Sequence, residues 1–267
     1  LHKAADGESE VEIELNDFLS ENGLYPVETD LGEYILQLRR ERPSHVVMPA
    51  IHLNAQQVGD AFRAGHTDLN PSRDLDHPND LLAEARAKLR QKFLNSDVGI
   101  TGANFLVAET GSIVLVTNEG NGDLLHTLSD THIVLAGIEK IVPTLSDAVA
   151  LVRVLARSAT TQEITSYTSV ISGPRQASDP DGPSAFHVVL VDNGRSGLLG
   201  SAFSDVLRCI RCGACQSLCP VYGAVGGHAY GAVYSGPIGS ILTPALVGLK
   251  AAKPLPEASS FCGQCQD

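Results

Sequence analysis

The first 208 residues of this 267-residue chain contain no cysteine, and all six cysteines lie between Cys209 and Cys265. A secreted protein stabilised by disulfides would usually spread its cysteines over the chain that they cross-link. Clustered cysteines in an otherwise ordinary sequence are more typical of metal ligation in a reducing compartment. The distribution therefore favours a metal-binding segment near the C-terminal end over a disulfide framework.

Basic residues are also scarce, because 19 Lys and Arg face 31 Asp and Glu for a net charge of −12. This balance argues against a nucleic-acid partner, which would need clustered positive charge to neutralise phosphates. No apolar run reaches the length of a membrane span, and LHKAADGESEVEIE at the start lacks the basic and apolar regions of a signal peptide. The first residue is Leu1 instead of Met, which suggests a fragment from which any upstream targeting signal would be absent. Small molecules and other proteins are the expected partners.

The first 200 residues show hydrophobic patterns that alternate between helix and strand. Helical spacing predicts helices over 13–23, 31–42, 79–97 and 145–157, with Asn79 as the N-cap of the third. Short apolar runs predict buried strands over 45–50, 98–101, 105–109, 112–117, 132–138, 165–174 and 187–193. The third and fourth of these strands are expected to form a hairpin that turns at Thr110 and Gly111. The pattern indicates an α/β domain that includes an antiparallel hairpin.

The composition changes near residue 200, where Gly, Cys, Pro and Ser become dominant. This change predicts a domain boundary, with an α/β domain over 1–200 and a smaller cysteine-containing domain over 201–267. The segment 221–261 is rich in Gly and Pro and is expected to be a connector with one short helix at 243–252.

The run CIRCGACQSLCP has the spacing of a bacterial ferredoxin motif. Cys209, Cys212 and Cys215 follow the C-x2-C-x2-C pattern, and Cys219 precedes Pro220. In that motif the first three thiolates ligate one 4Fe–4S cluster, and the fourth ligates a second cluster. Structural zinc remains the alternative, although it usually takes two well-separated cysteine pairs. The spacing therefore favours iron–sulfur chemistry.

A second cysteine pair, Cys262 and Cys265, lies close to the end of the chain. The first cluster would draw on Cys209, Cys212 and Cys215 and would need a further cysteine beyond Asp267. The second cluster would draw on Cys219, Cys262 and Cys265, and a full four-cysteine run would place another ligand where Ser259 stands. With three cysteines this cluster would be 3Fe–4S, or 4Fe–4S with a ligand other than cysteine. A redox-active dithiol remains the alternative interpretation of the pair.

Long segments of the chain closely resemble the lactate utilization protein B family. They include KFLNSDVGITGANFLVAETGSIVLVTNEGN, HVVLVDNGRS, CIRCGACQSLCPVYGAVGGHAYG and LPEASSFCGQC, and the resemblance runs from about residue 20 to the end. It implies an N-terminal LUD domain, similar in fold to the NagB/RpiA/CoA transferase-like proteins, followed by a small ferredoxin-like module with two clusters. In the family a small residue stands at the position of Ser259.

The resemblance also implies a function. Members would be cytoplasmic iron–sulfur electron-transfer subunits of a dehydrogenase-type complex, acting with two other lactate utilization proteins to oxidise L-lactate to pyruvate. Two alternatives stay open: a redox- or metabolite-sensing binding protein, and an electron-transfer subunit for another 2-hydroxy acid. Residues 1–15 depart from the family, because the acidic run GESEVEIE stands where a basic residue is expected.

Candidate substrate-binding residues in the α/β domain follow from the chemistry of a small anionic ligand. Gly-rich turns at strand ends offer backbone N–H groups, arginines can clamp a carboxylate, and a histidine can take a proton from a hydroxyl. The residues that meet these criteria are Glu109, Thr110, Gly111, Asn118, Glu119, Gly120, Asn121, His126, Arg175 and Arg195. Each also has a structural interpretation as a turn or surface residue. His228 and Tyr230 are expected to pack over the cluster loop.

Overall fold

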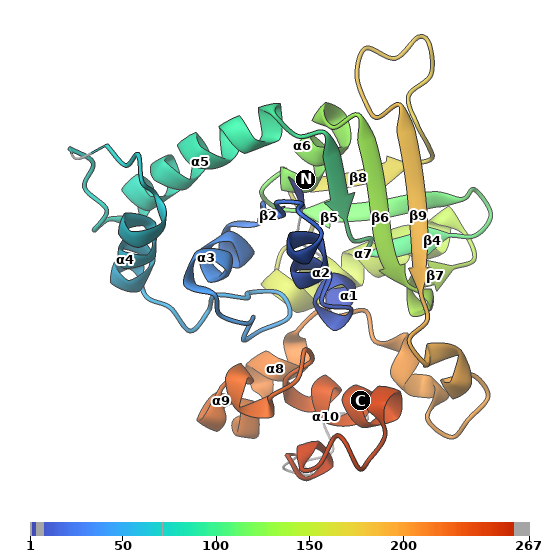
Figure 1. Cartoon of the computed structure of the whole chain (residues 1–267). Helices are drawn as coiled ribbons and strands as arrows, with labels where there is room; N and C mark the ends of the chain where they lie inside the picture. The colour runs from blue at the N-terminus through green and yellow to red at the C-terminus, as the bar shows by residue number, and fades with distance from the viewer. Residues whose placement is uncertain (1, 4–7, 71, 259–267) are drawn as a thin grey trace.

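A computed structural model describes residues 2–3, 8–70 and 72–258. Two β-sheets and their helices form the larger part of the molecule, and the helices that contain and follow the cysteine run lie together beneath it (Figure 1). The expected mixed α/β class is confirmed.

The first sheet is parallel throughout and has five strands in the order β2-β1-β3-β6-β9. Its strands are β1 (His2–Lys3), β2 (Val27–Glu28), β3 (Val98–Thr101), β6 (Thr131–Gly137) and β9 (Ala185–Val191). The last three of these were expected from short apolar runs, within two residues at each end.

The second sheet is mixed, with four strands in the order β7-β4-β5-β8. It consists of β4 (Phe105–Val107), β5 (Ser112–Thr117), β7 (Ile141–Val142) and β8 (Tyr167–Ile171). β4 and β5 form the expected antiparallel hairpin, and Gly111 occupies the left-handed region at φ 68° in its turn. The two sheets pack together through side chains such as Leu106, Ile113 and Val134.

Helices pack against both sheets, whereas β9 at the edge of the first sheet is not covered by a helix and has mostly exposed side chains (Figure 1). Those of the α/β part are α1 (Glu8–Glu12), α2 (Leu15–Glu21), α3 (Leu31–Arg39), α4 (Ala55–Gly65), α5 (Pro78–Leu94), α6 (Asn121–Leu128) and α7 (Leu145–Thr160), with 3-10 helices η1 (Ile138–Lys140), η2 (Arg195–Leu198) and η3 (Ser204–Arg208). α3, α4 and α5 share a core around Phe62 and Leu75, whereas α7 packs on the second sheet through Val152 and Leu155.

Two sequence-based predictions in this part are wrong. The segment 45–50 forms no strand, because side chains take up its backbone donors: Val47 and Met48 donate to Nδ1 of His45, and Val46 donates to Oε1 of Gln216. Helix α5 begins at Pro78, so His77 is its N-cap and not Asn79. Proline is favoured at the first helical position, where its missing N–H costs nothing.

The segment after the cysteines is not a connector with one helix. The described part of 221–261 contains most of α9 (Pro220–Val225), η4 (Gly227–Tyr230), α10 (Gly236–Val247) and η5 (Leu255–Glu257), and α8 (Ala214–Leu218) lies before it within the cysteine run. We call residues 209–258 the cysteine module. Its Gly and Pro residues end and begin short helices, so a composition typical of loops belongs here to a packed unit. The exact domain boundary near residue 200 stays a prediction.

The cysteine module packs directly on the α/β part through the segment 42–52, which we call the docking loop. The Tyr222 hydroxyl donates to the Ser44 carbonyl at 2.7 Å, and His228 Nε2 lies 2.7 Å from the Arg42 carbonyl oxygen. Gly227 fits against the same loop so closely that an added Cβ would lie 1.7 Å from the carbonyl oxygen of Ser44. The contact therefore requires glycine at this position.

This fit yields a matched pair of glycine substitutions. Gly227→Ala should lower the free energy of unfolding by about 1–3 kcal/mol, because the methyl group must displace the backbone of the docking loop. Gly223→Ala, in the exposed helix α9 with no heavy atom within 4 Å of the added Cβ, should leave stability equal or slightly higher. Chemical denaturation of both variants measures the difference. Equal stabilities would contradict the docking contact.

Candidate functional site

The cysteine run forms a loop and a short helix on the face of the module that meets the α/β part. Cys209, Cys212, Cys215 and Cys219 are half-buried, and Cys212 packs against the core between α7 and the second sheet. Gly213 has φ 73° and carries the chain into α8, so the loop turns back on itself directly after Cys212. The backbone N–H of Tyr222 donates to Cys219 Sγ at 3.5 Å.

The donor set of this loop fits an iron–sulfur cluster. Four cysteine side chains within eleven residues are the ligands that such clusters use, and the backbone N–H that Cys219 accepts is a typical second-sphere contact. Among residues 2–3, 8–70 and 72–258, no three Cys, His, Asp or Glu side chains are close enough together to hold a metal ion. Gathering the thiolates around one point would therefore accompany metal binding. Ser259, Cys262 and Cys265 lie outside the described residues.

His45 of the docking loop lies against the cysteine run. A Cβ added at Gly213 would stand 2.8 Å from His45 Cε1, and Val46 donates its N–H to Gln216 Oε1 at 3.3 Å. The His45 ring also meets the Tyr222 ring edge-on at 5.8 Å. Only 3% of His45 is exposed, and this burial lowers the pKa of its imidazole, which favours the neutral form.

A buried network of charges joins the cysteine run to the α/β part. Arg195 Nη1 and Nη2 bind the two carboxylate oxygens of Glu12 at 2.8 and 2.7 Å, and its Nε lies 2.7 Å from Glu139 Oε2. The other oxygen of Glu139 accepts from Nη2 of Arg211 at 3.0 Å, and Arg211 stands between Cys209 and Cys212 in the sequence. Tyr234 donates to Glu12 and its ring lies under the Arg211 guanidinium at 4.9 Å. We call these five residues the bridging network.

The side chains of the four charged residues in the bridging network are at most 7% exposed. Burial alone would raise the pKa of Glu12, but hydrogen bonds from Arg195, Tyr234 and Asn193 outweigh it and hold that pKa below its ordinary value. Burial likewise opposes the charge on Arg195, whereas Glu12 and Glu139 raise its pKa. Each of the four charges thus pairs with an opposite charge on another element, which fixes the relative positions of α1, η1, η2 and the cysteine run.

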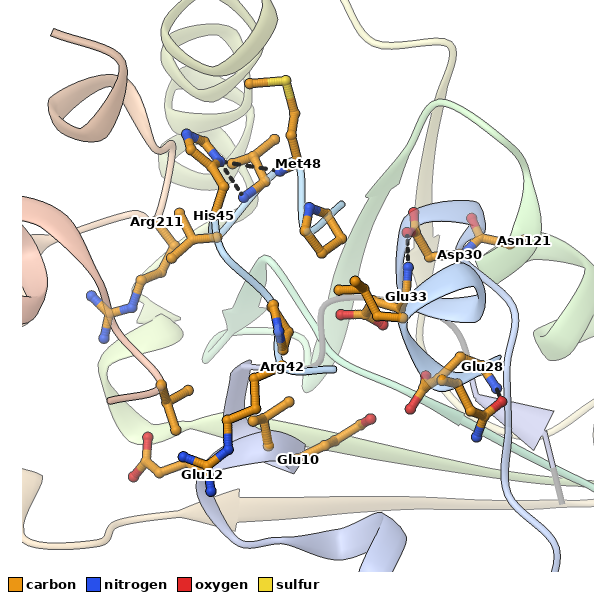
Figure 2. A pocket seen from close by; sticks show the side chains of 18 of the residues that line it. Glu10, Glu12, Glu28, Asp30, Glu33, Arg42, His45, Met48, Asn121 and Arg211 are labelled. Carbon is orange, nitrogen blue, oxygen red and sulfur yellow. Dashed lines mark hydrogen bonds between the residues drawn. The ribbon is translucent and has the colours of Figure 1, made fainter. Parts of the chain in front are cut away.

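A cavity of about 950 Å³ lies between α1, α3, the docking loop and the cysteine run, and Figure 2 shows its lining from close by. Its charged lining is mainly acidic and includes Glu10, Glu28, Asp30, Glu33, Glu41 and Glu119. Arg42 and Arg211 add positive charge on the side of the cysteine module (Figure 2). The cavity therefore connects a carboxylate-rich wall with the residues that hold the cysteine run.

Two of these carboxylates meet at the N-terminus of α3. Asp30 caps the helix by accepting the N–H of Glu33 at 3.1 Å, and Glu119 accepts the N–H of Leu31 at 3.2 Å. Glu119 is exposed on the cavity wall, where the surrounding protein atoms nonetheless remove part of the water from its carboxylate. This desolvation, together with the charge of Asp30, raises its pKa to about 7, whereas the Leu31 N–H lowers it. Burial likewise raises the pKa of Asp30, against the N–H groups that it accepts.

The structure brings some of the sequence-predicted substrate residues together. Asn118, Glu119 and Asn121 line the cavity, and Gly120 between them adopts φ 74° at the start of α6. Asn118 is held in place by accepting the N–H of Ser166 at 3.1 Å. These residues remain the predicted substrate-binding group.

The other predicted residues lie outside this cavity. Glu109 accepts the N–H of Leu145 at the start of α7, and Thr110 and Gly111 form the β4–β5 turn. His126 Nδ1 lies 3.2 Å from Nδ1 of the buried His132. Arg175 is exposed on the loop before β9. Arg195 does clamp a carboxylate with both Nη atoms, but the carboxylate is that of Glu12.

Sequence reasoning missed His45, Glu12, Glu139 and Arg211. Arg211 offered a signal, because it stands inside the cysteine run and has φ 61°, unusual for a residue other than glycine. Glu12 belongs to the acidic run GESEVEIE, which departs from the family pattern, but nothing in the sequence indicates that Arg195 is its partner. His228 was expected over the cluster loop, but its imidazole instead contacts His52 and the Arg42 carbonyl of the docking loop.

The carboxylate pair yields a pH prediction. Because the pKa of Glu119 in the folded protein lies above its unfolded value, the folded state holds an extra proton between about pH 4.5 and 7, and stability falls as the pH rises through that window. Asp30→Asn keeps the helix cap but removes the charge beside Glu119. We expect the pKa of Glu119 to fall toward its ordinary value and the stability loss to shrink. Carboxyl carbon NMR titration measures the pKa, and an unchanged value near 7 would contradict the interpretation.

The sequence was compared with protein families and individual proteins. The LUD domain family matches residues 4–191, and the 4Fe-4S dicluster domain family matches residues 205–267. Lactate utilization protein B of Bacillus subtilis (strain 168) is 51% identical over 257 residues, and that of Geobacillus thermodenitrificans (strain NG80-2) is 52% identical over the same length. Each alignment covers 96% of this chain and 53% of the relative, so the chain spans about half the length of the curated relatives it matches.

Among solved structures, a DUF162 family protein from Deinococcus radiodurans matches with 23% identity and a TM-score of 0.30, over 38% of this chain and 57% of that one. That partial likeness carries no argument, and similarity to the NagB/RpiA/CoA transferase-like fold stays a prediction. The family matches cover both parts of the molecule in the order in which they occur. The chain belongs to the LUD domain family and is a homologue of lactate utilization protein B, with a LUD domain followed by a 4Fe-4S dicluster domain.

Proposed function

We propose that this chain is the iron–sulfur electron-transfer component of a cytoplasmic system that oxidises L-lactate to pyruvate with two other lactate utilization proteins. The observation that carries the proposal is the four-cysteine loop, which the bridging network holds against the LUD domain. Similarity to lactate utilization protein B over 96% of the chain supplies the metabolic context. No described helix is long and apolar enough to cross a membrane.

The residues divide between two clusters in this proposal. Cys209, Cys212 and Cys215 would hold one cluster, and Cys219 would join Cys262 and Cys265 on the other. Bound clusters supply reversible one-electron storage. The chain itself partly buries the thiolates, packs Cys212 against the LUD core and donates a backbone N–H to Cys219, which together limit solvent access and stabilise charge on sulfur.

The charge of the cavity bears on where lactate is oxidised. Lactate is an anion, and the carboxylates that dominate the lining would repel it. We therefore assign electron transfer to this chain and place lactate oxidation on a partner protein. The residues that the sequence predicts to bind substrate stay a prediction. They are Glu109, Thr110, Gly111, Asn118, Glu119, Gly120, Asn121, His126, Arg175 and Arg195.

Metal analysis tests the cluster assignment. The full-length protein purified without oxygen should contain roughly seven or eight iron atoms and about eight sulfides per chain, depending on whether the second cluster is 3Fe–4S or 4Fe–4S, and Cys212→Ser should lose about half of both. Ser217→Ala, in the same helix as Cys215, should lose none. Zinc without sulfide would contradict the proposal.

Reduction by lactate tests the functional assignment. In the reconstituted three-protein system, L-lactate should reduce the clusters, which is followed as bleaching of their visible absorption. Absence of reduction in a system with full iron content would contradict electron transfer and favour a redox or metabolite sensor. Reduction by a different 2-hydroxy acid in place of lactate would reassign the substrate.

A further inference from the structure

His45 presents a buried hydrogen-bond donor that has no acceptor in the described protein. Its Nδ1 atom accepts the backbone N–H groups of Val47 and Met48, each at 3.1 Å, as Figure 2 shows. Two donors facing Nδ1 require that this nitrogen carry its lone pair and no proton. The neutral ring must then carry its proton on Nε2, because the hydrogen bond at one nitrogen sets the tautomer of the other.

The Nε2 atom is buried and has no hydrogen-bond partner in the described part of the chain. A buried N–H that loses its bond to water without gaining another destabilises the folded state, so native proteins rarely leave one unsatisfied. Such a donor indicates an acceptor that the polypeptide itself does not supply.

The position of the ring identifies the chemistry of that acceptor. Cε1, the carbon bonded to both ring nitrogens, faces Gly213 in the middle of the C-x2-C-x2-C run, where an added Cβ would stand 2.8 Å from it. Gly213 lies directly between Cys212 and the helix that carries Cys215. The acceptors that would become available there on cluster binding are thiolate and sulfide sulfurs, both of which take N–H hydrogen bonds.

We propose that His45 Nε2 donates a hydrogen bond to a sulfur of the cluster held by Cys209, Cys212 and Cys215. The same tautomer excludes His45 as the fourth ligand of that cluster: iron would need the Nε2 lone pair, which would move the proton to Nδ1 and against the two backbone donors. The docking loop of the LUD domain thereby contributes to the electronic environment of a cluster bound by the cysteine module.

The consequence is a change in cluster potential. A hydrogen bond to sulfur stabilises the additional electron of the reduced cluster, so the donor raises the midpoint potential. His45→Asn offers a selective test, because the Asn Oδ1 can still accept the N–H groups of Val47 and Met48 whereas the Nε2 donor is lost. His52→Asn is the matched control in the same loop, since both nitrogens of His52 are paired, with Ser44 and Glu41.

The experiment is an anaerobic redox titration of the full-length protein, followed by electron paramagnetic resonance. We expect His45→Asn to retain its iron and to change the ratio of oxidised to reduced cluster at a fixed poise by roughly tenfold toward oxidised, which corresponds to about 59 mV for one electron. His52→Asn should titrate like the wild type. His45→Gln can place an amide N–H near the position of Nε2, so its midpoint potential should lie between those of His45→Asn and the wild type.

A second measurement needs no variant. In wild-type protein labelled with 15N-histidine, the reduced cluster should show a weak 15N coupling typical of a hydrogen-bonded imidazole, and His45→Asn should abolish it. A strong coupling of a directly bound nitrogen, or an unchanged potential in His45→Asn, would overturn the proposal. The proposal about His45 rests on the proposed function only in requiring that a cluster is bound. Wild-type protein that contains no iron and sulfide would refute the proposed function instead.

Discussion

The bridging network is the constraint on which the arrangement of the molecule depends. Arg195 and Arg211 share the carboxylate of Glu139, and Arg195 also holds both oxygens of Glu12. Buried ion pairs add little net stability, but removing one partner is costly because the other charge is then left without compensation. The main effect of the network is therefore to fix the position of the cysteine run against the LUD domain. Its net contribution to the free energy of folding is small.

This position gives the LUD domain a role in the chemistry of the cysteines. Arg211 lines the cavity and stands inside the cysteine run, while the docking loop places His45 on Gly213. The LUD domain thus supplies part of the surface that buries Cys212, and its His45 ring lies against the cysteine run. The mainly acidic lining of the cavity agrees better with the proposed electron-transfer role than with binding of an anionic substrate.

The sequence predicted most of what depends on local pattern. Strands β3, β5 and β6 and helix α7 follow from apolar periodicity, and the cysteine spacing points directly to the ligand set. The docking loop was predicted as a strand because its apolar residues are β-branched, but His45 satisfies its backbone donors locally. The bridging network could not be predicted, because Glu12 and Arg195 are 183 residues apart and each alone is typical of a surface charge.

The most direct test is hydrogen–deuterium exchange of Glu139→Gln, a substitution in the LUD domain that weakens the pairing of both arginines while keeping the size of the side chain. If the bridging network holds the cysteine module in place, amides of α8, α9 and α10 should exchange faster than in the wild type. Amides of β3 and β6 should stay equally protected. Unchanged exchange throughout the cysteine module would contradict the central role of the network.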